Sequence, residues 1–180
     1  MVTCTRSYAN IPSKVNLQKR GVITEEAELK CRLCSEKEES TDHVLVECIY
    51  AWRIWAACYS CWDMCTASQR GIQNLFRQHR DMFRLLKVKE AWKLIWFAVI
   101  WTLRNWRNQM VFGKEMNKEM EVMDLIKFRW FTWLKAKDYP KIDLEMWKVN
   151  PRQAFIHALR KWFGIITTTR FKCLMRKIMF

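Results

Sequence analysis

Four residues within a short segment carry the side chains that zinc prefers. Cys31 and Cys34 form a C-x2-C pair, His43 follows eight residues after the pair, and Cys48 follows four residues after His43. Thiolates and imidazole are the usual ligands of a tetrahedral zinc ion, and a two-residue gap lets both thiolates of a pair reach one ion. The pattern C-x2-C-x8-H-x4-C therefore predicts one zinc ion per chain, bound by Cys31, Cys34, His43 and Cys48.

The alternative is a set of unrelated buried thiols and a surface histidine. The surroundings of the C-x2-C pair argue against it, because the neighbours Glu28, Lys30, Arg32, Ser35 and Glu36 are polar and could not bury two free thiols. His43 and Cys48 lie five residues apart, which is off a shared face of a regular α-helix with 3.6 residues per turn. We therefore expect a helix that starts late or is distorted between them.

The remaining cysteines and histidines are predicted to lie outside metal sites. Cys58, Cys61 and Cys65 are spaced i, i+3 and i+7 in an aromatic segment, which predicts one buried, unliganded face of a helix. His79 lies in a basic stretch and is expected to be solvated, whereas His157 lies on an apolar helix and is expected in the core or an interface.

No set of residues predicts catalysis. The sequence has no glycine-rich phosphate loop, and its paired carboxylates lack an apolar setting. His43 could activate Cys48 as a nucleophile, but joint zinc ligation explains this pair better. We expect a protein that is not an enzyme and takes no small-molecule substrate.

The composition is that of a folded, basic chain. Of 180 residues 51% are hydrophobic, and 32 Lys and Arg against 18 Asp and Glu give a formal charge of +14. Such a charge indicates a polyanionic partner and says nothing about the fold. The most apolar stretch, 94–103, is too short for a bilayer, and no secretory signal precedes it. We expect no membrane partner and an intracellular, reducing compartment, either nucleus or cytoplasm.

Apolar periodicity and few turn residues predict a mainly α fold, a small zinc-stabilised N-terminal module followed by a Trp-rich helical bundle. Within the segment 83–112, apolar residues spaced at 4, 3, 4, 3 and 4 predict a buried seam: Trp92, Trp96, Val99, Leu103, Trp106 and Met110. We expect this seam to pack against a helix with Trp130 and Trp133. Helices are predicted over 14–20, 49–64, 83–112, 117–137 and 151–163.

The predicted elements divide the chain into three parts. They are a zinc-binding module with an aromatic helix (1–65), a helical region (66–149) and a basic helical tail (150–180). The tail has seven basic and no acidic residues, whereas the segment 21–48 around the metal ligands has eight acidic and three basic ones.

The motifs of the N-terminal part occur together in one known domain. Four motifs follow one another: P-[ST]-x3-L-x2-R-G within Ile11 to Gly21, the C-x2-C pair, E-[ST]-x2-H-x4-C ending in the segment from Ser40 to Cys48, and a Trp-containing helix at Ala51 to Trp55. This arrangement resembles the reverse-transcriptase zinc-binding domain near the C-terminal end of plant LINE-type retrotransposon polyproteins. The resemblance implies a zinc-binding, nucleic-acid-associated module. The signature of the polymerase itself, which is an aromatic residue followed by one spacer and two aspartates, is absent from this sequence.

Two functions remain open. The first is binding of DNA or RNA through phosphate contacts, with Lys14, Lys19 and Arg20 as the first candidates and a second set at Arg77, Arg80, Arg84, Lys87 and Lys89. The second is a scaffold in which zinc only pins a loop and exposed aromatic residues dock a reverse-transcriptase polypeptide, including the case of a retroelement remnant without function. Burial of Trp52, Trp55 and Trp62 favours the scaffold, and their exposure beside Arg53 favours base stacking.

Overall fold

The computed structural model describes residues 11–24, 28–65, 70–82, 86–112, 119–137 and 142–163. These residues form helices and no β-strand; the antiparallel contact between Lys30 and Glu38 is an isolated bridge. The elements are α2 (Lys14–Lys19), a π-helical turn η1 (His43–Glu47), α3 (Ile49–Ser60), α4 (Ile72–Asp81), α5 (Leu86–Val111), α6 (Glu119–Ala136), α7 (Leu144–Val149) and α8 (Pro151–Phe163). The predicted mainly α fold is confirmed.

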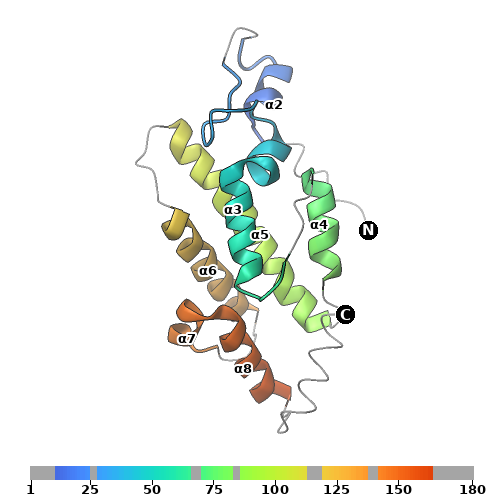
Figure 1. The fold of residues 1–180 in the computed structure, drawn as a ribbon, viewed down its shortest axis with the longest axis vertical. Helices are drawn as coiled ribbons and strands as arrows, with labels where there is room; N and C mark the ends of the chain where they lie inside the picture. Colours follow the sequence, from blue (N-terminus) through green and yellow to red (C-terminus); the bar gives the residue numbers. More distant parts are fainter. Residues whose placement is uncertain are drawn as a thin grey trace.

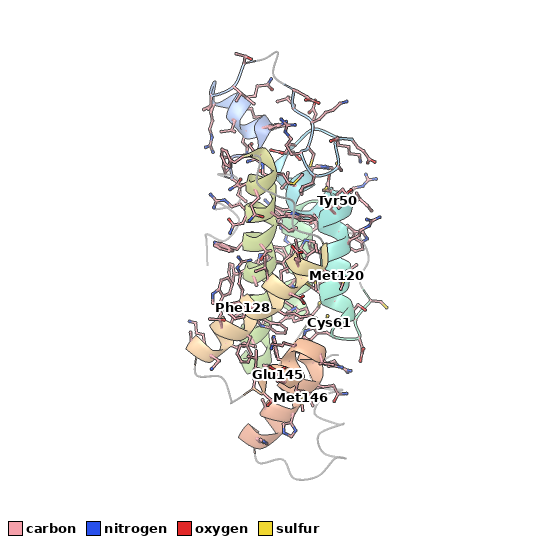
Figure 2. The ribbon with its side chains drawn as sticks, turned by 90° about the vertical axis from the view of Figure 1, so that its left-hand side faces the viewer. Tyr50, Cys61, Met120, Phe128, Glu145 and Met146 are labelled. Atoms are coloured by element: carbon pink, nitrogen blue, oxygen red, sulfur yellow. The ribbon has the colours of Figure 1, made fainter. Side chains whose placement is uncertain are left out.

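The long helix α5 is the axis of the molecule. Helices α3, α4 and α6 surround it, α2 and the loop with the C-x2-C pair cover one end, and α7 and α8 lie at the other end (Figure 1). Side chains fill the space between α3, α5 and α6 (Figure 2). None of the described helices is long and apolar enough to cross a membrane.

Local signals explain several helix ends. The Ser13 hydroxyl accepts a hydrogen bond from the backbone N–H of Asn16 at the start of α2, and Gly21, with φ of +67°, follows the end of that helix. Helix α8 begins at Pro151, in agreement with the expected boundary. Helix α4 was not predicted from the sequence. Its first N–H group, on Ile72, donates to the Asp42 carboxylate at 2.9 Å, so a distant loop caps it.

The predicted seam on α5 is buried from Trp92 to Trp106, and its last member, Met110, is half-buried. Its tryptophans are at most 4% exposed and its Val99 and Leu103 are fully buried. Their ring contacts run mainly to α3 and α4, where the centroid of Trp96 lies 4.9 Å from that of Trp55. Helix α6 does pack along α5, but against residues of α5 that lie beside the seam. There the Trp130 indole N–H donates to the carbonyl of Ala91 at 3.0 Å.

His79 is buried, so the prediction of a solvated histidine is wrong. Its Nε2 donates to the carbonyl of Trp92 at 2.9 Å, which leaves Nδ1 to accept from the Tyr59 hydroxyl at 3.2 Å. The ring stacks on Trp92 with centroids 4.6 Å apart, and burial lowers the pKa of His79 to about 3. The side chain is therefore a neutral member of the aromatic core.

Two further expectations about single residues are corrected. His157 is exposed on α8, so the core position is wrong and the interface position stays a prediction. Of the second cysteine cluster, only Cys58 is buried, whereas Cys61 is half-buried and Cys65 is exposed. The reason is that α3 ends at Ser60, so the i, i+3, i+7 spacing does not continue on a helix face.

Candidate metal centre

The four predicted ligands converge at the start of α3. One ligand atom from each of Cys31, Cys34, His43 and Cys48 lies within 4.8 Å of the other three, and Cys34 Sγ is 3.2 Å from His43 Nε2. A tetrahedral zinc ion with Zn–S bonds of about 2.3 Å holds its ligand atoms about 3.5–3.8 Å apart. The side chains therefore need only small movements to share one ion.

A tight turn presents the C-x2-C pair. The N–H of Ser35 donates to the carbonyl of Cys31 at 2.8 Å, and the N–H of Cys31 donates to the carbonyl of Lys37 at 2.8 Å. Ser35 has a φ of +59°, in the left-handed region, which turns the chain back directly after Cys34. Both thiols consequently face the same side of the loop, toward His43.

The turn from His43 to Cys48 is distorted as expected. Residues His43–Glu47 form a π-helical turn in which the N–H of Cys48 donates to the carbonyl of His43, five residues earlier, at 2.7 Å. This wider turn brings residues i and i+5 to the same side of the chain. Cys48 is then extended, with φ of −60° and ψ of 135°, and α3 starts after it. Both side chains thus reach the centre from consecutive elements.

Electrostatic coupling within the centre favours one thiolate, at Cys31, and disfavours a second one at Cys48. A hydrogen bond from the Cys48 thiol lowers the pKa of Cys31 to about 5, and the same interaction raises the pKa of Cys48. His43 is buried, and its Nδ1 has no hydrogen-bond partner in the part of the chain that the structure describes, so Nε2 is the atom that faces the thiols. The donor set of three sulfurs and one nitrogen fits zinc.

Comparison with known families covers this same segment. Residues 3–55 match the family described as zinc-binding in reverse transcriptase. The match includes all four candidate ligands of the centre, so the resemblance found in the sequence is confirmed for residues 3–55. No curated protein and no solved structure gives a significant match to the chain.

The zinc-binding domain is joined to the helices by a buried ion pair that sequence reasoning missed. The carboxylate of Glu39 is fully buried and accepts hydrogen bonds from the Arg107 guanidinium on α5, through Nε at 3.0 Å and through Nη2. It also accepts from the backbone N–H groups of Lys14 at 3.1 Å and Arg32 at 3.4 Å. One side chain thus connects α2, the C-x2-C loop and α5.

Of the three basic residues predicted to contact phosphate, Lys14 has a structural role in the domain. Its Nζ donates to the carbonyls of Glu28 at 2.9 Å and Lys30 at 2.8 Å, and so holds the loop before Cys31. Lys19 and Arg20 are exposed at the end of α2. Lys19 lines an open groove of about 520 Å³ together with Arg70, a residue that the sequence did not connect to it.

The second basic set is spread over several environments. Arg77 and Arg80 are exposed on α4, and Arg80 pairs with Asp81. Arg84 and the side chain of Lys87 lie outside the described residues. The role of both basic sets in binding stays a prediction.

Proposed function

We propose that this chain is a non-catalytic module of reverse-transcriptase origin in which Cys31, Cys34, His43 and Cys48 hold one structural zinc ion. The convergence of four ligand atoms within 4.8 Å carries this proposal. Structural zinc sites use four protein ligands, whereas catalytic sites leave a position for water or substrate. The order of motifs and the family match support descent from a reverse-transcriptase polypeptide, as in LINE-type retrotransposons.

The zinc ion would pin the N-terminal loop to the helical bundle. Cys48 is the residue directly before α3, and α3 buries Trp55 against Trp96 of α5. Trp55 and Trp62 are buried and Trp52 is half-buried, which favours packing over base stacking for this helix. Zinc binding would therefore supply folding free energy to a loop that has few large apolar residues of its own.

Zinc stoichiometry in the purified chain tests the proposal. The wild-type chain and the control Cys61→Ser, which changes a half-buried thiol outside the centre, should each retain one zinc per chain after dialysis. Cys34→Ser should lose most of its zinc and melt at a lower temperature, and chelation should lower the melting temperature of the wild type but not of this variant. A wild-type chain that retains no zinc, or a Cys34→Ser variant that retains one zinc ion per chain, would contradict the proposed site.

A second proposed function is binding of nucleic acid through phosphate contacts. Its support is the formal charge of +14 and the position of exposed Lys19 beside Arg70 along one polar groove. Arg20 lies next to Lys19 at the end of the same helix. Phosphate contacts of this kind give affinity without sequence specificity.

The salt dependence of binding tests this second function. On duplex DNA each neutralised phosphate contributes about −0.9 to the slope of log affinity against log salt. The double variant Lys19→Ala/Arg20→Ala should flatten the slope by up to about two units, whereas Lys135→Ala/Lys137→Ala, an equal charge change at the end of α6, should not. Equal effects of the two variants would show that only net charge matters, and no binding at low salt would leave the scaffold as the function.

A further inference from the structure

Helix α5 has a second ordered face opposite its buried seam. Phe97, Trp101, Arg104 and Asn108 are spaced at 4, 3 and 4 residues, so they follow one line along the helix. Phe97 is 43% and Trp101 is 46% exposed, Arg104 is exposed and Asn108 is half-buried. We name these four residues the α5 stripe. An exposed line of two aromatic rings, a guanidinium and an amide is not required by the packing of the bundle.

An arginine from the neighbouring helix organises the centre of this stripe. The guanidinium carbon of Arg129, on α6, lies 4.0 Å from the centroid of the Trp101 ring, within the range of a cation–π contact. Arg129 Nη1 also donates to the Thr102 hydroxyl at 2.7 Å, and that hydroxyl donates in turn to the carbonyl of Ala98. The tryptophan is therefore held in place while almost half of its surface faces solvent.

Arg104 on the α5 stripe and Arg129 beside it contribute two positive charges. Among the described residues no carboxylate forms an ion pair with Arg104 or Arg129. The acidic residue of α5, Glu90, is paired with Lys93. A polyanion complements these two guanidinium groups, and guanidinium groups beside flat aromatic rings suit a polyanion with bases free to stack.

We propose that the α5 stripe is a stacking platform for single-stranded nucleic acid, with Trp101 as the main contact to a base and Arg104 and Arg129 as contacts to phosphates. This inference rests on the proposed binding of nucleic acid and adds its strand type and a second surface. The bases inside a duplex are stacked on one another, so an indole ring reaches their flat faces only where that stack is opened. Stacking is tolerant of sequence because every base has a flat face.

Binding of the full-length chain to a labelled single strand of about 16 nucleotides tests the stripe. Trp101→Ala should weaken binding by about 5- to 150-fold, the range found when one stacked base loses its aromatic partner, and Trp101→Phe should restore part of the affinity. The matched control is Phe128→Ala, which removes an aromatic ring that is 61% exposed on α6 outside the stripe (Figure 2). We expect this control to change affinity by less than about twofold, which is too little for a lost stacking contact.

Charge and strand type are tested in the same titrations. Arg104→Gln should weaken binding more than Lys135→Gln, an equal charge change at an exposed site on α6. A blunt duplex of equal length should not respond to Trp101→Ala. Far-UV circular dichroism and zinc content of each variant should match the wild type, because Trp101 is 46% exposed and is not one of the four candidate metal ligands.

The outcomes separate this inference from the function on which it rests. If Lys19→Ala/Arg20→Ala weakens binding and Trp101→Ala does not, nucleic-acid binding stands and the stripe is wrong. If Trp101→Ala instead abolishes self-association seen by sedimentation, the stripe is an interface between copies of the chain and the inference is also wrong. If neither strand type binds at low salt, both proposals fail.

Discussion

Replacing Glu39 by Gln should cause one of the largest losses of stability available outside the metal centre. The substitution removes the charge that faces Arg107 while keeping nearly the same shape. The arginine, with its side chain 9% exposed, would then be buried without a counterion. Removing one partner of a buried ion pair costs about 3–5 kcal/mol. Weakened hydrogen bonds from the N–H groups of Lys14 and Arg32 would add to this loss.

Urea unfolding of zinc-saturated protein, followed by circular dichroism, measures this loss. With a slope of about 3 kcal/mol per M, the unfolding midpoint should fall by about 1–2 M. The matched control is Glu90→Gln, which breaks a solvent-exposed ion pair with Lys93 and should cost at most about 1 kcal/mol.

A double-mutant cycle isolates the pair itself. Arg107→Met should also be strongly destabilising, because it leaves the Glu39 carboxylate buried with only backbone donors. The double variant Glu39→Gln/Arg107→Met buries no unpaired charge, so it should lose less stability than the sum of the single variants. If Glu39→Gln costs no more than Glu90→Gln, or if the single effects simply add, the reasoning about the buried pair is refuted.

Two further predictions follow from the aromatic core. The pKa of His79 is lowered to about 3 in the folded chain and is about 6.5 in the unfolded chain, so between these pH values only the unfolded state binds the extra proton. The free energy of unfolding should therefore fall with decreasing pH by up to about 1.4 kcal/mol per unit below pH 6.5. In urea titrations His79→Gln should remove this slope, and the exposed control His157→Gln should retain it. Trp96→Ala, at a fully buried site, should cost about 3–5 kcal/mol of unfolding free energy or prevent folding. Phe97→Ala, at the exposed next position, should cost less than about 1.5 kcal/mol. Thermal or urea unfolding that ranks the two variants in the opposite order would contradict the assignment of the faces of α5.

The convergence of the four candidate ligands and the main helices could be predicted because the relevant information is local. Zinc ligation restricts residue types and short spacings, so Cys31 to Cys48 could be assigned without knowledge of the fold. The five-residue interval between His43 and Cys48 also predicted the irregular turn there. The seam of α5 follows from helical periodicity in the same way.

What the sequence did not show depends on contacts between distant segments. Glu39 opens the motif before His43, but nothing in the sequence shows that it is buried while Glu36 and Glu38 are not, because its burial depends on Arg107, 68 residues later. The burial of His79 follows from its position one turn after Leu75 on α4, but its polar type and basic neighbours indicated a solvated residue. Cys65 was misplaced because nothing in the local pattern marked the end of α3 at Ser60.

The link between Glu39 and Arg107 also limits how this chain can evolve. The family match ends at residue 55, before α5 begins, so recombination that transferred the matched segment alone would carry the carboxylate away from its guanidinium. The recipient would inherit a buried, unneutralised acid, and selection would replace it. The two positions should therefore vary together among descendants of this sequence, with Arg at 107 retained wherever an acid is retained at 39.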